Sequence, residues 1–339
     1  MSRLNRLTRH HFRAHAVPGT ASHSEQYWHG LLGHDGKPLR RYREAAEFAA
    51  EAHALWPLLE GTTVKADVAM IYDYDSLWVS RFQGSYDGNN YHDALRRFYG
   101  AFFRAGVNAD MVPTTADLAR YRVVVAPQFH VLPDAVARKL AAYVKAGGVL
   151  VTDSRTGVKD ATNLCHERTL PGLLADALGI TIEEYEGLGR DITYRVVGEK
   201  ELPGEFTAHR YADWAAATHA QSLAGYTDWH MRAFAAATRN RFGKGTGYYV
   251  GTVIQEEAFY DALIADVLRT ARIRPLAAPP PGVEVSLRQG RGRKLLFLLN
   301  HTETEQTVTV PAGKRELITG ATTGSQLKLG IFGVAVIKL

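Results

Sequence analysis

The sequence has very little cysteine: Cys165 is the only one in 339 residues. It therefore forms no internal disulfide and offers no cysteine-built metal site, as is common in a reducing compartment. No apolar run approaches the roughly 20 residues that a bilayer crossing needs. The basic N-terminus lacks the apolar stretch and small-residue cleavage site of a secretory signal. These absences predict a soluble, cytoplasmic protein with no membrane partner.

The sequence also has only a small excess of positive over negative charge. The 40 Lys and Arg residues nearly balance the 35 Asp and Glu residues, which gives a formal net charge of +5. Basic residues are dispersed except at residues 3–13 and 37–43, and a nucleic-acid-binding domain needs a broader basic patch. Histidines at positions 10, 11, 15 and 23 match no zinc spacing. We expect no nucleic-acid partner, no metal and no cofactor.

The length suits two or three domains, each large enough for a core of its own. Residues 1–62 combine an irregular lead-in with a helix over residues 40–59. Its recurring positions, among them Tyr42, Ala49 and Trp56, predict one face packed against a neighbour.

Residues 63–275 alternate short apolar runs with helical stretches, a pattern typical of a parallel sheet covered by helices. Pro133 with Asp134 marks a predicted helix start, and Gly106 and Gly147 mark helix ends. We predict an α/β domain with a flavodoxin-like or amidotransferase-like parallel sheet. Residues 276–282 (LAAPPPG) form a linker, and residues 283–339 contain five short strands that predict a small antiparallel β-sandwich.

Several segments together resemble one known family. SEQYWHGLLGHDGKPLRRY, which starts at Ser24, resembles the exit from the (β/α)8 barrel of glycoside hydrolase family 42 β-galactosidases. DVAMIYDYDSLW, FYGAFFRAGVNADMVP and SRTGVKDATNLCHE look like the family's trimerisation domain, and LLFLLNHT and GIFGVAVIKL resemble its C-terminal β domain. The resemblance begins near Phe12, although HHFRAHAVPGTASH departs from the more aromatic final barrel strand of the family.

This resemblance implies a part without catalysis. Retaining glycosidases use two carboxyl groups about 5 to 5.5 Å apart, carried on barrel strands. Both lie upstream of the aligned region in the family, and the Asn-Glu pair that contains its acid/base is absent from these 339 residues. No residue of this chain therefore inherits a catalytic role, and the chain alone is expected to be inactive.

Two positions match residues that hold galactose hydroxyls in the family. By this resemblance Glu25 and His29 contact the sugar, and Trp28 could add an apolar surface. A spacing of four residues would place Glu25 and His29 on one face if that stretch is helical. The alternative is that, without a barrel around them, they are solvent-exposed relics.

Other residue groups have structural readings beside functional ones. Cys165-His166-Glu167 lacks the glycine-flanked strand-to-helix turn of a nucleophile elbow, so we expect packing rather than catalysis there. Asp73 and Asp75 follow an apolar strand, where open α/β sheets bind ligands, but Asp at that position commonly caps the next element. The tryptophans at 56, 214 and 229 form no periodic platform for sugar stacking and are expected to be core or interface anchors.

Three hypotheses remain open. The chain is the assembly part of a β-galactosidase, expected to be a homotrimer, with aromatic residues of the predicted helix at 91–103 either at the subunit contact or facing the sheet. It is a helper subunit for a separately encoded barrel, which would bind a galactoside only when that barrel is supplied. Or it is a regulatory flavodoxin-like domain that binds a small molecule near Asp73.

Overall fold

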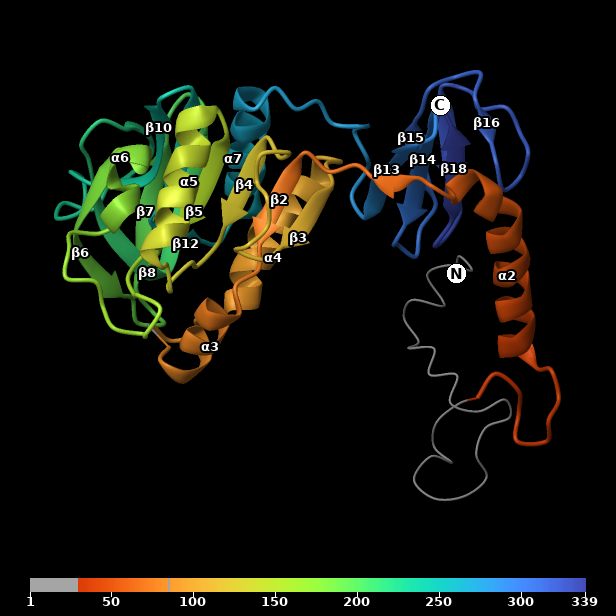
Figure 1. The fold of residues 1–339 in the computed structure, drawn as a ribbon, viewed down its shortest axis with the longest axis horizontal. Helices are drawn as coiled ribbons and strands as arrows, with labels where there is room; N and C mark the ends of the chain where they lie inside the picture. The colour runs from red at the N-terminus through yellow and green to blue at the C-terminus, as the bar shows by residue number, and fades with distance from the viewer. Residues whose placement is uncertain (1–29, 85) are drawn as a thin grey trace. The chain divides into compact units, whose positions relative to one another are not determined.

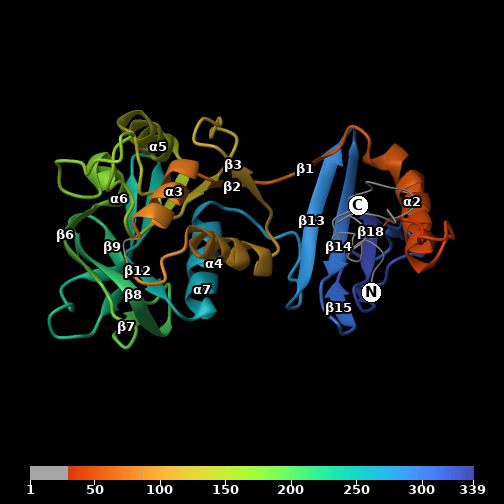
Figure 2. The same cartoon turned by 90° about the horizontal axis from the view of Figure 1, so that it is seen from below.

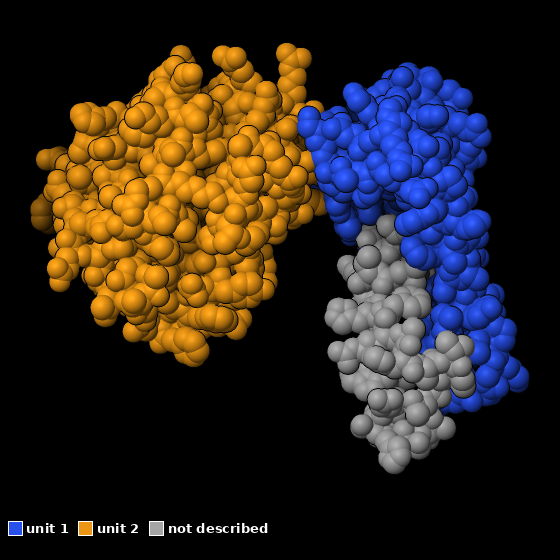
Figure 3. Space-filling view, viewed as in Figure 1, with its two compact units in different colours: residues 1–65, 276–339 blue, residues 66–275 orange. Residues whose placement is uncertain are grey.

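The computed structural model describes residues 30–84 and 86–339, which divide into two compact units (Figure 3). Unit 1 consists of Met1–Lys65 together with Leu276–Leu339, and unit 2 is Ala66–Pro275. Unit 1 is therefore built from two segments that are distant in the sequence. Among the described residues, none of the helices combines the length and apolarity that a bilayer span requires.

Unit 2 is built on one mixed sheet with the strand order β12-β8-β7-β9-β10-β11-β5-β4-β2-β3, and β6 pairs with β8 (Figure 1). Pairing is parallel from β11 to β3 and antiparallel elsewhere. The strands are β2 (Val68–Ile71), β3 (Ala109–Val112), β4 (Val123–Ala126), β5 (Val149–Asp153), β6 (Ile180–Gly187), β7 (Thr193–Gly198), β8 (Gly204–Ala217), β9 (Gln221–Tyr226), β10 (Ala235–Phe242), β11 (Gly245–Val250) and β12 (Thr252–Ile254).

Helices cover both faces of the parallel part of this sheet, because successive side chains of a strand point to opposite faces. Val123 and Val125 pack in the core on the side of α4 and α7, whereas Val124 packs on the side of α5 and α6 (Figure 2). The helices are α3 (Tyr74–Phe82), α4 (Tyr91–Arg104), α5 (Asp134–Ala146), the 3-10 turn η2 (Gly172–Leu174), α6 (Ala175–Leu178) and α7 (Glu257–Thr270).

The predicted helix boundaries are confirmed where the punctuation is strongest. Pro133 is the N-cap of α5, whose first residue is Asp134. Gly147 ends α5 with φ +127°, a conformation that side chains with a Cβ rarely adopt. Helix α3 was not predicted as a separate element.

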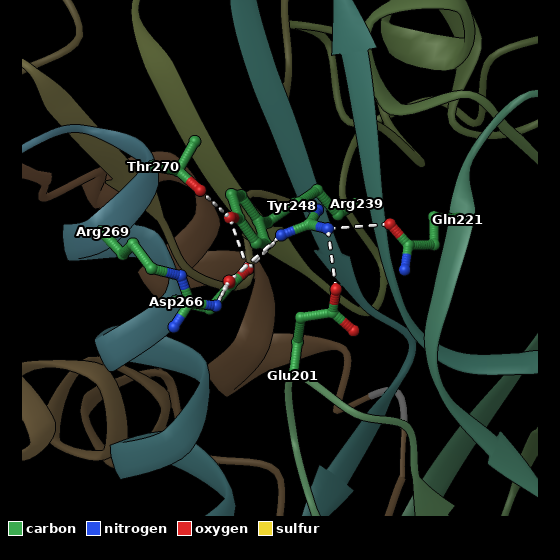
Figure 4. Close-up of polar contacts among 7 residues, drawn as sticks. All are labelled: Glu201, Gln221, Arg239, Tyr248, Asp266, Arg269 and Thr270. Atoms are coloured by element: carbon green, nitrogen blue, oxygen red, sulfur yellow. Dashed lines mark hydrogen bonds and ion pairs between the residues drawn. The ribbon is translucent and has the colours of Figure 1, made fainter.

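A buried carboxylate fastens α7 to the antiparallel strands (Figure 4). Asp266 is fully buried and accepts from Arg239 Nη1 at 2.9 Å and from the Tyr248 hydroxyl at 2.7 Å. Arg269, one turn along α7, also pairs with it, and Arg239 Nη2 reaches Gln221 Oε1 at 2.8 Å. A charge out of water is tolerated only with such partners, so this network fixes α7 on β10 and β11.

Unit 1 contains helix α2 (Arg40–Leu59) and an antiparallel β part. The face of α2 that was predicted to pack is largely exposed in the described residues, with Tyr42 at 40% and Trp56 at 63%. Its sheets have the orders β1-β13-β14-β18-β16 and β15-β17 around a core that includes Val285 and Leu298. The strands are β1 (Thr63–Val64), β13 (Val283–Gly290), β14 (Arg293–Asn300), β15 (Gln306–Thr309), β16 (Arg315–Glu316), β17 (Gln326–Leu329) and β18 (Val334–Lys338).

Candidate functional site at the carboxyl edge of the sheet

The predicted galactose contacts Glu25, Trp28 and His29 lie outside the described residues, as do the histidines at positions 10, 11, 15 and 23. The structure therefore gives them no geometry. Within the described ranges, 30–84 and 86–339, no group of three His, Cys, Asp or Glu side chains is arranged to hold a metal ion. The remaining candidates lie around the carboxyl ends of the parallel strands.

Asp73 follows β2 at the point where the sheet order reverses, between β2 and β4. Its carboxylate is the N-cap of α3 and accepts from the Ser76 amide at 2.7 Å, and burial raises its pKa. The buried Tyr91 hydroxyl accepts from the Asp73 amide at 2.8 Å, and Ser76 Oγ accepts from the Val131 amide at 3.1 Å. Side chains and backbone of the chain itself thus occupy this edge, and the capping interpretation of Asp73 is confirmed.

Cys165 and His166 are not arranged as a nucleophile and its base. The residue is exposed and lies in an isolated antiparallel bridge with Lys159. The His166 imidazole instead contacts the Leu132 carbonyl oxygen, with Nε2 at 3.2 Å. The imidazole is thus engaged with a backbone carbonyl rather than with the thiol.

The outer face of α3 carries three exposed aromatic side chains, Tyr74, Trp78 and Phe82, which we call the α3 stripe. Their exposed fractions are 61%, 51% and 84%. Steps of four residues place them along one side of the helix, and the rings of Tyr74 and Trp78 lie 6.1 Å apart. Contiguous exposed apolar side chains of this kind mark interaction surfaces.

The inner face of α3 holds the stripe in place. Ser76, Leu77, Val79 and Ser80 are buried against unit 2. Just after the helix, Gln83 accepts from Lys159, which also donates to Asn163 Oδ1 at 2.8 Å. The stripe is thus carried on an element anchored at both ends. The sequence signal for the stripe is the four-residue spacing of the aromatic positions 74, 78 and 82. It would have been visible if a helix had been predicted over these residues.

Helix α4 carries the aromatic residues that were predicted either to form a subunit contact or to face the sheet. The structure shows that they face the sheet. Tyr91, Phe98 and Phe102 of α4 are at most 1% exposed and pack in the core of unit 2. Tyr99 is 41% exposed. The spacing of the three buried rings matches the face that meets the sheet, because seven and eleven residues return to the same side of a helix.

Two buried carboxyl groups, not singled out in the sequence, lie behind this edge. Asp153 ends β5 and accepts from the Gln128 amide, and burial raises its pKa to about 7. Asp213 of β8 accepts from the Tyr211 hydroxyl at 2.9 Å and from the Tyr249 hydroxyl, and burial raises its pKa. Sequence reasoning missed Asp213 because its partner Tyr249 comes from β11, a strand that is distant in the chain.

These features define an α/β domain with an exposed aromatic stripe on one helix, accompanied by a small antiparallel β domain. Family models identify both: residues 66–274 match the β-galactosidase trimerisation domain, and residues 282–339 match the β-galactosidase C-terminal domain. The chain belongs to the glycoside hydrolase family 42 β-galactosidases.

Individual relatives agree. The chain is 28% identical to β-galactosidase BgaA of Clostridium cellulovorans, over 97% of this chain and 49% of that one. It is 34% identical to β-galactosidase Bga of Halorubrum lacusprofundi, over 84% and 43%. The crystal structure of a Bacillus circulans β-galactosidase superposes with a TM-score of 0.89 at 29% identity, covering 94% of this chain and 48% of that chain. The chain thus spans about half the length of these relatives and matches their trimerisation and C-terminal domains.

Proposed function

We propose that this chain is the non-catalytic assembly part of a cytoplasmic β-galactosidase of carbohydrate metabolism, and that it associates as a homotrimer through the α3 stripe. The carrying observation is the stripe itself: three large rings exposed on an anchored helix of the domain that matches the trimerisation model. Aromatic side chains are enriched at the buried centres of protein interfaces. Hydrolysis of terminal β-galactosides would require the barrel carboxylates of the family.

The test is the mass of the purified chain by light scattering and sedimentation. We expect a trimer that Trp78→Ala with Phe82→Ser converts to monomer, while circular dichroism stays unchanged. Trp56→Ala is the matched control, because Trp56 is also exposed, at 63% against 51% for Trp78, but lies on α2. A monomeric parent chain, or a double variant that remains a trimer, would contradict the proposal.

A helper role for a separate barrel subunit is the second candidate, in which Glu25, His29 and Trp28 would complete a galactose pocket. It predicts that mixing with a family 42 barrel fragment yields galactosidase activity, and that Glu25→Gln removes the activity. The parallel strand order β3-β2-β4-β5-β11 supports a flavodoxin-like or amidotransferase-like core. A regulatory ligand near Asp73 is disfavoured, because Tyr91 and α3 occupy that edge.

A further inference from the structure

A second aromatic group of unit 2 lies on its antiparallel strands, away from α3 in the sequence. It consists of Tyr194 on β7, Trp214 on β8, and Trp229 with His230 in the turn between β9 and β10; we call these four residues the Trp229 cluster. The His230 ring lies at its centre. Its centroid is 5.2 Å from Trp229, 5.3 Å from Tyr194 and 5.8 Å from Trp214. The fold therefore joins two tryptophans that the sequence analysis treated as unrelated anchors.

The cluster has a packed inner side and an open outer side. Tyr194 and Trp214 are partly buried against the core of unit 2, whereas Trp229 is 82% exposed. An indole left this far in water contributes little to the stability of the chain itself. The turn that carries Trp229 is nevertheless anchored, because Met231, two residues further on, is fully buried.

The turn that carries Trp229 is fixed by backbone contacts. The Thr227 amide donates to the Arg195 carbonyl at 3.0 Å, and the Asp228 carboxylate accepts from the Arg195 amide at 3.2 Å. The amides of Met231 and Arg232 both donate to the Asp228 carbonyl at 2.9 Å. The backbone that carries the indole is thus held in place before any ligand arrives, which lowers the entropic cost of binding.

Polar groups border the rings. Trp214 Nε1 donates to Glu186 Oε1 at 3.3 Å, and the Tyr194 hydroxyl lies 3.3 Å from His230 Nε2. Burial and the nearby Glu186 raise the pKa of Tyr194 to about 12, so its hydroxyl keeps a proton to donate. The cluster therefore combines an apolar ring face with a carboxylate, a phenol and an imidazole.

The size and charge of the cluster indicate its ligand. A stable protein interface buries roughly 800 Å² on each side, whereas here a single ring is widely exposed, unlike the three of the α3 stripe. Of the adjacent cations, Arg195 is paired with Glu205 at 3.1 Å and Arg232 is exposed, whereas the Glu186 carboxylate lies directly beside the rings and disfavours an anion there. A ligand with an apolar C–H face and a rim of hydroxyls satisfies both the indole and the polar border.

We propose that the Trp229 cluster binds a neutral saccharide, with one sugar ring stacked on Trp229 and its hydroxyls directed to Glu186 and Tyr194. This is a binding site without catalysis, made of other residues than the predicted galactose contacts Glu25, Trp28 and His29. The proposal does not depend on self-association of the chain.

The test is titration of the full chain with galactose, lactose and maltose, followed by calorimetry and tryptophan fluorescence. We expect saturable binding of at least one sugar, weakened at least tenfold by Trp229→Ala and less by Trp229→Phe, which retains a ring. Glu186→Gln should also weaken binding. Trp56→Ala, which removes an exposed indole from unit 1, should leave the affinity unchanged.

The opposing outcomes are equally defined. Absence of saturable binding for all three sugars, or equal binding by the parent chain and Trp229→Ala, would overturn the proposal. So would a drop in sedimenting mass on Trp229→Ala without sugar binding by the parent chain, because the indole would then be a subunit contact. A monomeric parent chain that still binds sugar would refute trimerisation and leave this site intact.

Discussion

Tyr91 and Asp73 are joined by a hydrogen bond of 2.8 Å, in which the Asp73 amide donates to the Tyr91 hydroxyl. The Asp73 side chain is directed to the first turn of α3, where it accepts from Ser76. Backbone and side chain of one residue thus connect the end of β2 to two helices, and the helix that carries the α3 stripe begins at this junction.

Loss of the Asp73 cap should loosen α3. Asp73→Ala is expected to lower the free energy of unfolding by about 1 kcal/mol, because one N-terminal amide of the helix loses its acceptor. Asp73→Asn keeps an acceptor oxygen and should cost less. Urea denaturation followed by circular dichroism measures both, and equal stability of the parent and the Ala variant would show that the cap contributes nothing.

The buried Asp153 should make stability depend on pH. Burial raises its pKa from an ordinary 3.8 to about 7 in the folded chain. The contribution of Asp153 to the stability of the fold is complete below pH 3.8 and is lost as the pH rises through about 7. Between these pH values Asp153 ionises in the unfolded chain but stays protonated in the folded chain. Facing groups are Arg97, Asp213 and the Gln128 amide. Asp153→Asn should therefore gain stability relative to the parent as the pH rises from 4 to 8.

Measurement of that difference at several pH values isolates Asp153 from the other carboxyl groups. Glu256 and Glu316 have lowered pKa values through hydrogen bonds that outweigh burial, so they lose stability as the pH falls in parent and variant alike. The exposed Asp191→Asn is the control. A parent-to-variant difference that does not change with pH would refute the buried acid.

Asp266 and Asp261 offer a matched pair on α7. Asp266→Ala should destabilise the chain by about 3 to 5 kcal/mol, because Arg239 loses its buried partner. Asp261 pairs with Arg104 at 2.7 Å but is 43% exposed, so Asp261→Ala should cost at most about 1 kcal/mol. Thermal and urea unfolding compare them. Similar costs at both positions would show that burial does not set the value of the Asp266 network.

The inward direction of α4 is tested by two adjacent rings. Phe98→Ala should cost about 3 to 5 kcal/mol because it leaves a cavity in the core. Tyr99→Ala, at a position 41% exposed, should cost much less. If Tyr99→Ala proved the more damaging change in unfolding experiments, the assignment of the inner face would be wrong.

Local pattern predicted much of this fold. The alternation of apolar runs with helical periods gave the parallel strands β2, β4, β5 and β11 and the helices α4, α5 and α7, and Pro133 and Gly147 set the limits of α5. The parallel strand β3 was not predicted, and the sheet is mixed rather than parallel throughout. The five predicted C-terminal strands are present, and β1 and β17 add to them. Short strands such as β1 are formed by their pairing partners and carry almost no signal of their own.

The site was less accessible to the sequence for the same reason. Asp213 becomes a candidate only because β11 brings Tyr249 next to it. Trp229 becomes one only because β8 brings Trp214 next to His230. Both groupings depend on the strand order. The exposed face of α2 shows the converse: periodicity predicted that Tyr42 and Trp56 pack, but the pattern cannot name the surface that receives them.

The pairing of Thr63 with Gln289 determines an order of events during translation. Arg288, whose guanidinium also donates to the Thr62 carbonyl, lies 226 residues after Thr62. At about 5 to 20 residues per second, the ribosome delivers β13 only tens of seconds after β1. All of Ala66–Pro275 emerges in that interval. The larger unit can thus complete its own core while β1 still waits for the strand that will receive it.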